Sequence, residues 1–135
     1  REIQTEFGPE VLQIVLDCTD SIPGADGRKA PWRQRKQQYL ATLPEKKARS
    51  LLVVACDKLF NARAINADLR TSGLEVFDRF AGKLEGTLWY YRELGRALGS
   101  TDLRPAIALN VEVEEMKRRA AQAVIEHYSE IGAAS

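Results

Sequence analysis

Apolar residues recur at helical spacing along almost the whole of this 135-residue chain, and that periodicity limits the folds open to it. Near the N-terminus, Val11, Ile14, Val15 and Cys18 fall on one face of a helix. No segment alternates apolar and polar residues for long enough to predict a sheet. The length suits one domain, so we predict a single all-α domain of about five helices.

Turn signals divide the chain into these helices. Residues 21–27 hold two Gly and a Pro and predict a loop, and a polar helix is expected from about residue 31 to 43. TLPE at 42–45 and SGLE at 72–75 have the pattern of capping boxes, which predicts helices that start there and end near residues 69 and 98. A last helix follows Pro105, with one stripe formed by Val113, Met116, Ala120, Val124 and His127.

Charge and composition exclude several classes of function. Twenty basic and nineteen acidic residues give a net charge of +1, so no global field favours nucleic acid as a partner. The longest apolar run, residues 51–56, is far shorter than the roughly 20 residues that span a bilayer. Both cysteines, Cys18 and Cys56, lie in apolar stretches, which predicts buried, reduced thiols in a cytoplasmic protein.

One acidic residue stands out, because Asp57 directly follows that apolar run. We expect it on the most buried helix, where an ionised carboxylate is costly unless it is paired or binds a metal. Asn61 lies one turn later on the same face, and Lys58 and Arg63 lie on other faces. The residues leave two interpretations open: an ion pair with an arginine of a neighbouring helix, or a metal ligand beside a substrate-binding asparagine.

A basic cluster and an aromatic triplet are weaker signals. Five positive charges fall within residues 28–36 around Trp32, and they include Arg28, Lys29, Arg33 and Lys36. They suit either a rim that attracts a polyphosphate or a solvated helix face. The WYY triplet at 89–91 suits either stacking on a purine base or core packing.

Five short segments stand in the order and spacing of a known family. They are EFGPEV at 6–11, CTD at 18–20, PWRQRK at 31–36, VACDKLFNAR at 54–63 and GTLWYY at 86–91. Together they resemble HD-domain phosphohydrolases of the guanosine polyphosphate (ppGpp) hydrolase type. The resemblance covers roughly residues 2–98. It implies that residues 1–99 are the C-terminal part of an HD domain and that residues 100–135 are a helical extension of it.

The resemblance implies a metal-dependent hydrolase of nucleotide pyrophosphates, with the ion, commonly manganese, held by a His, a His-Asp pair and a later Asp. Asp57 matches the later Asp, Asn61 matches a substrate-contacting Asn, and Arg63 belongs to the same signature. With Lys58, Arg33 and Lys36 we expect these residues to bind a nucleotide polyphosphate. The implied chemistry is attack on a phosphate by metal-activated water.

The family's His, His-Asp and Glu-Asp motifs precede the EFGPEV segment, and the sequence printed here holds none of them. The resemblance therefore implies that the catalytic residues lie upstream of Arg1. His127 lies outside the matching segments. We expect a domain that lacks its N-terminal helices, from an enzyme whose isolated fragment is inactive. The alternative is a non-enzymatic helical module that binds a nucleotide or a protein, with the C-terminal helix as an element for homo-oligomers.

Overall fold

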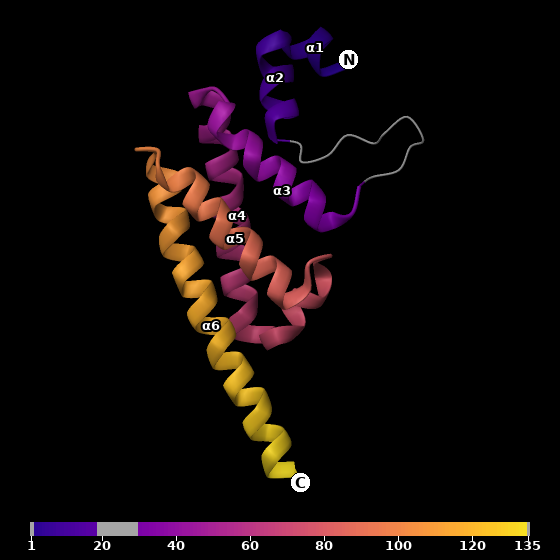
Figure 1. Ribbon diagram of the computed structural model, residues 1–135, viewed down its shortest axis with the longest axis vertical. Coiled ribbons are helices and arrows are strands. Elements are labelled where there is room, and N and C mark those ends of the chain that lie inside the picture. The colour runs from indigo at the N-terminus through magenta and orange to yellow at the C-terminus, as the bar shows by residue number, and fades with distance from the viewer. Residues whose placement is uncertain (1, 19–29, 135) are drawn as a thin grey trace.

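The computed structural model describes residues 2–18 and 30–134, and every regular element in these ranges is helical (Figure 1). The six α-helices there are α1 (Glu2–Phe7), α2 (Pro9–Cys18), α3 (Trp32–Thr42), α4 (Ala48–Ser72), α5 (Lys83–Gly99) and α6 (Arg104–Ala134). Two 3-10 helices, η1 (Leu43–Glu45) and η2 (Gly73–Arg79), flank α4. The all-α prediction is confirmed. The loop predicted at 21–27 lies outside the described residues.

The core lies between α4, α5, α6 and η2, with α4 and α6 running side by side (Figure 1). Buried residues on α6 recur at intervals of three or four, and those on α4 fall at multiples of the same helical spacing, so each helix turns one apolar face to the core. On α4 these are Val54, Ala62, Ile65 and Leu69, and on α6 they are Ala106, Leu109, Val113, Met116 and Ala120. The predicted inward stripe of the last helix is confirmed as far as Ala120, and His127 beyond it is exposed.

A tryptophan docks α3 onto α5. The Trp32 ring lies against Gly82 and Gly86, where an added Cβ atom would come within 2.5 and 3.0 Å of ring atoms. It also meets Trp89 edge-on, with 6.2 Å between ring centroids. Glycine is therefore required at this contact, since any side chain there would displace the ring.

Polar contacts dock α2 onto α4. The buried Ser50 hydroxyl donates a 2.6 Å hydrogen bond to the Asp17 carboxylate, and the Lys46 ammonium donates to the Asp17 carbonyl. At the other end of α2, Arg49 pairs with Glu10 at 2.9 Å. No α2 residue is fully buried, so these contacts fix where α2 lies.

Both predicted capping boxes are wrong. The Thr42 hydroxyl donates back to the Tyr39 carbonyl at 2.8 Å, and the chain becomes extended at Lys46 before α4 begins at Ala48. Ser72 makes no side-chain cap and is the last residue of α4. In both places a 3-10 helix without a side-chain cap follows, and the next α-helix begins only later, at Ala48 and at Lys83.

The continuous helix predicted from residue 74 to 98 is also wrong in its first half. Residues 73–79 form η2, the backbone is extended at Phe80, and α5 starts at Lys83 with a positive φ of 55°. Val76 and Phe77 of η2 are buried in the core. A tight 3-10 segment followed by a break lets both side chains face inward, at the cost of helical continuity.

The apolar run at 51–56 is only partly buried. Val54 and Ala55 are fully buried, whereas Leu52, Val53 and Cys56 are exposed. Successive residues turn by about 100° around a helix, so six adjacent positions cannot share one face. The prediction of two buried thiols is therefore wrong for Cys56, and Cys18 is half-buried.

A helix that crosses a membrane must be both long and apolar. Among the described residues, no helix combines the length and the apolarity that crossing a bilayer requires.

Candidate functional site

Helix α4 carries Asp57 and Asn61 one turn apart on one face, and both side chains reach solvent. The Asp57 side chain is 55% exposed and its Oδ2 lies 3.5 Å from Lys58 Nζ. The prediction that Asp57 is buried is wrong, because the buried stripe of α4 passes to one side of it. Its described ion pair is with the adjacent lysine, not with an arginine of a neighbouring helix.

Burial and the negative charge of Asp57 together raise the pKa values of two nearby groups. Burial raises the pKa of Tyr91, on α5, to about 12, and the nearby negative charge of Asp57 adds to the shift. Burial also raises the pKa of the Cys18 thiol at the end of α2, again with Asp57 as the second cause. Asp57 therefore lies where α2, α4 and α5 approach one another.

Asn61 opens into a hollow of about 330 Å³ that Tyr91 and Phe80 also line. On its rim Arg79 and Asp68 form an ion pair of 2.7 Å. The hollow thus has an aromatic wall with an amide and an ion pair at its edge. This combination suits a planar polar group rather than a bare anion.

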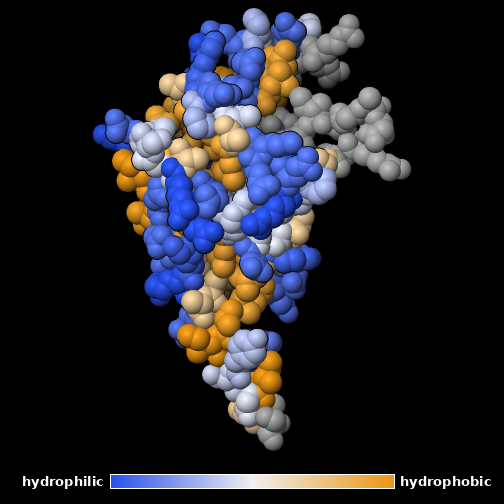
Figure 2. Space-filling view, viewed as in Figure 1, coloured by the Kyte–Doolittle hydropathy of each residue, from blue (hydrophilic) through white to orange (hydrophobic). Residues whose placement is uncertain are grey.

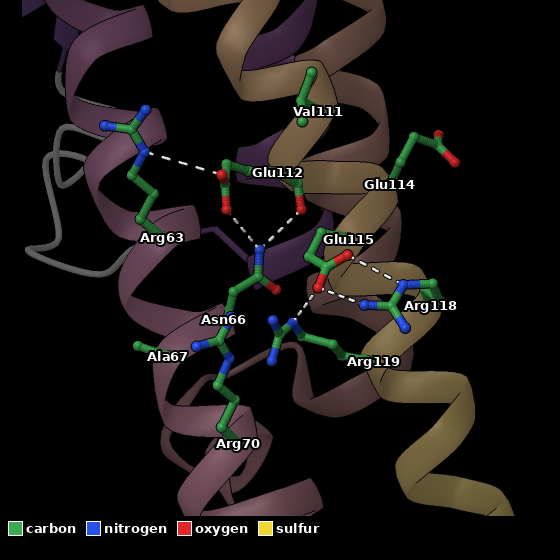
Figure 3. A pocket seen from close by; sticks show the side chains of 10 residues that line it. All are labelled: Arg63, Asn66, Ala67, Arg70, Val111, Glu112, Glu114, Glu115, Arg118 and Arg119. Atoms are coloured by element: carbon green, nitrogen blue, oxygen red, sulfur yellow. Dashed lines mark hydrogen bonds and ion pairs between the residues drawn. The ribbon is translucent and has the colours of Figure 1, made fainter.

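Arg63 lies apart from Asp57 and Asn61. It faces α6 across a groove, where its Nε lies 3.9 Å from the Glu112 carboxylate (Figure 3). Asn66, in the same groove, donates to the backbone carbonyl and the carboxylate of Glu112, both at 3.0 Å. Since six helical positions separate Arg63 from Asp57, the two side chains point to different sides of α4. The structure does not bring Arg63 to the expected site.

Arg33 and Lys36 both lie over aromatic rings of α5. The guanidinium carbon of Arg33 is 3.9 Å from the centroid of the Trp89 ring, and Lys36 Nζ is 4.7 Å from that of Tyr90. Such cation–π contacts hold the cations at fixed positions while one side of each remains able to meet an anion. Arg28 and Lys29, the rest of the predicted cluster, lie outside the described residues.

Lys58 joins this group from α4. Its ammonium nitrogen is 5.8 Å from the ring centroids of both Tyr39 and Tyr90, and its side chain is only 15% exposed. Lys36 and Lys58 therefore approach the same Tyr90 ring from two helices. We call this group the cation–aromatic cluster and define it as Arg33, Lys36 and Lys58 with the rings of Tyr39, Trp89 and Tyr90.

The sequence missed Tyr39 as a member of the cluster. It is buried on α3, three residues after Lys36, a spacing that places two side chains on neighbouring positions of a helix. That spacing in an otherwise polar helix is the signal that would have found it. Of the two alternatives predicted for the aromatic triplet, core packing is confirmed: Tyr90 and Tyr91 are buried in the core and Trp89 packs against it. Trp89 and Tyr90 also carry cations on their faces.

Asp57 does not make a metal site with the residues described. Within 2–18 and 30–134, no three His, Cys, Asp or Glu side chains are grouped so that they could hold an ion. One carboxylate falls short of the ligand count that Mn²⁺ requires. The described residues alone therefore do not fit a bound metal.

The catalytic residues expected upstream of Arg1 stay a prediction. Arg1 itself lies outside the described residues, and the first residue that the structure describes is Glu2 of α1. Helices α1 and α2 carry the EFGPEV segment that the family's catalytic motifs would precede. The expected catalytic residues would precede these helices in the chain, so none of the contacts given above involves them.

Comparison of the sequence with protein-family models found no matching family, and a search of curated proteins found no match.

Proposed function

We propose that this chain is the substrate-binding part of an HD-type metal-dependent phosphohydrolase, which cleaves the pyrophosphate of a guanosine polyphosphate or a related nucleotide. In this proposal the cation–aromatic cluster binds the phosphates and Asp57 supplies one metal ligand. Asn61 contacts the nucleotide from the rim of its hollow.

One observation carries the proposal: Lys58 lies 3.5 Å from Asp57 and also shares the Tyr90 ring with Lys36. The expected metal ligand and the expected phosphate-binding cations therefore meet at one point of the surface. A cation bound at Asp57 and the ammonium groups beside it would neutralise adjacent parts of the same polyphosphate.

The remaining metal ligands would have to come from outside the described residues. The face of α4 that carries Asp57 offers a surface for them, because Val53 and Phe60 lie on the same face and are exposed. Apolar side chains beside a solvent-exposed carboxylate are suited to pack against a segment that brings further ligands.

The test is manganese-dependent release of pyrophosphate from guanosine 3',5'-bis(diphosphate) by the protein as its gene encodes it. Asp57→Asn should abolish release, while Asp102→Asn, which changes an exposed carboxylate elsewhere, should leave it unchanged. The 135-residue chain should bind the nucleotide without hydrolysing it. If the gene-encoded protein releases no pyrophosphate in the presence of manganese, the hydrolase proposal fails.

A binding module is the second candidate, favoured by the absence of any metal-binding group of side chains among the described residues. It predicts that the 135-residue chain binds the nucleotide through the cluster and that no form of the protein hydrolyses it. Lys36→Ala and Lys58→Ala should weaken such binding, and Lys47→Ala, at an exposed lysine outside the cluster, should not.

A further inference from the structure

Helix α6 has a second stripe, on the side that faces away from the core. Its positions are spaced by three or four residues, so they form one seam along the helix. The stripe consists of Ile107, Val111, Glu114, Arg118, Ala121, Ile125 and Tyr128, all of which are exposed. Three large aliphatic side chains exposed on one seam are unusual for a helix that faces only water.

The charges in this stripe are arranged to match a second copy of themselves. Glu114 and Arg118 are 72% and 68% exposed, and each forms an ion pair only along its own helix in the described residues. Figure 3 shows both on α6 at the edge of the groove between α4 and α6, with the Glu114 carboxylate pointing away from α4. If two α6 helices pair antiparallel through this stripe about a dyad level with residue 116, Glu114 of each faces Arg118 of the other.

The same register also matches the apolar positions. Ile107 of one copy faces Ile125 of the other, and Val111 faces Ala121, so apolar pairs flank the two ion pairs on both sides. A parallel arrangement would instead place Glu114 against Glu114 and Arg118 against Arg118, and like charges in contact oppose association. Glu114 and Arg118, at the centre of an apolar stripe, therefore favour the antiparallel direction of the two helices and this register.

We infer that α6 mediates an antiparallel homodimer through this outward stripe. The contact is isologous, because the same patch of both copies meets itself about a twofold axis. Nothing in the inference depends on the proposed function, since the stripe is exposed and carries no residue of the cation–aromatic cluster. In Figures 1 and 2 the C-terminal part of α6 extends beyond the other helices, where a second chain can reach it.

The size of the contact indicates a weak dimer. From Ile107 to Ile125 the stripe is roughly 27 Å long at 1.5 Å per residue, along a helix roughly 10 Å wide. Such a strip is smaller than the interface of a stable permanent dimer. We therefore expect a dimer whose population rises with protein concentration.

Charge exchange tests the dimer. Sedimentation equilibrium over a range of concentrations should give a monomer–dimer equilibrium for the unmodified chain. Glu114→Arg and Arg118→Glu should each weaken dimerisation roughly tenfold or more, because both ion pairs become like-charge contacts. The double variant, Glu114→Arg with Arg118→Glu, should restore it. Glu126→Arg makes the same charge change on α6 outside the stripe and should have no effect.

Restoration by the double variant is specific to the antiparallel register, since a parallel pair would keep like charges in contact in every variant. Circular dichroism melting of each variant checks that the monomer remains folded. A chain that stays monomeric at its highest soluble concentration overturns the inference. Single variants that dimerise as well as the unmodified chain, while remaining folded, overturn it as well.

Discussion

The Ser50 hydroxyl of α4 donates a 2.6 Å hydrogen bond to the carboxylate of Asp17 on α2. Ser50 is 1% exposed, so water cannot replace this partner without a movement of α2. Because α2 buries no residue fully, a buried hydroxyl and a carboxylate supply much of what holds it in place. The position of α2, and with it that of Cys18 beside Asp57, thus depends in part on this hydrogen bond, together with the contacts from Lys46 and Arg49.

Removing this hydroxyl should loosen α2. Ser50→Ala is expected to lower the free energy of opening of α2 by about 1–2 kcal/mol, the range for a hydrogen bond to a charged acceptor that partly recovers water. Amide hydrogen exchange of residues 10–18 measures this directly. Ser129→Ala, at an exposed position of α6, should leave the exchange of α2 unchanged. Equal protection of α2 in Ser50→Ala and the unmodified chain would contradict the assignment.

Acid should weaken the same contact. The hydrogen bond from Ser50 is the largest cause of the lowered pKa of Asp17. A carboxyl whose folded pKa lies below the unfolded value of about 3.9 stabilises the fold above that value and loses this contribution as the pH falls further. The stability difference between the unmodified chain and Ser50→Ala should therefore shrink between about pH 7 and pH 3. Urea unfolding at both pH values measures it, and a constant difference would exclude this linkage.

The pKa of Tyr91, on α5, should respond to the charge of Asp57. Its pKa of about 12 has burial as its main cause and the charge of Asp57 as the second. Asp57→Asn should therefore lower the pKa of Tyr91 while leaving it above about 10, the ordinary value. Absorbance titration of the phenolate measures this, with Tyr91→Phe to identify the signal and Asp102→Asn as the control. An unchanged pKa would mean that Asp57 and Tyr91 do not face a common space.

The raised pKa of Tyr91 should make the stability of the fold depend on pH in the alkaline range. A tyrosine whose folded pKa is raised contributes its stability fully below the unfolded value of about 10 and loses it as the pH rises towards the folded value. The chain should therefore become less stable between about pH 10 and 12, and Tyr91→Phe should remove part of that dependence. Thermal melting at a series of alkaline pH values compares the two proteins.

Gly95 should be sensitive to substitution because α6 approaches it closely. An added Cβ would lie 2.5 Å from Oδ1 of Asn110, whose amide nitrogen donates to the Gly95 carbonyl at 3.1 Å. Gly95→Ala should destabilise the chain by about 1–3 kcal/mol, although alanine favours helix. Gly132→Ala, where no atom lies within 4 Å, should be neutral or slightly stabilising. Urea unfolding decides, and equal effects at the two glycines would contradict the close packing of α5 and α6.

Periodicity predicted the fold class and the inward stripe of α6 because both depend on burial averaged over many turns. Single positions were predicted less well. Asp57 was expected to be buried because it follows six apolar residues, yet in a helix the neighbours of a side chain are three and four positions away. Val53 and Phe60, which share its face, are exposed as well. Helical spacing would not have corrected this prediction, because Val53 and Phe60 are apolar and their exposure follows only from the tertiary structure.

Parts of the candidate site could not be predicted from the sequence without the tertiary structure. Lys36 and Lys58 are far apart in sequence, and their meeting over Tyr90 depends on how α3 and α4 pack against α5. The separation of Arg63 from Asp57, in contrast, follows from counting around the helix. The metal site and the nucleotide remain predictions, since they rest on the five matching segments and not on a contact between described residues.

The docking of α3 through Trp32 gives the molecule a spectroscopic probe of its own. The chain has two tryptophans, Trp32 and Trp89, and their rings meet edge-on at the cation–aromatic cluster. Arg33 lies on the face of one of them. Intrinsic tryptophan emission therefore originates entirely from this contact, so a shift in its wavelength or intensity reports either separation of α3 from α5 or the arrival of an anion at Arg33, without an attached dye.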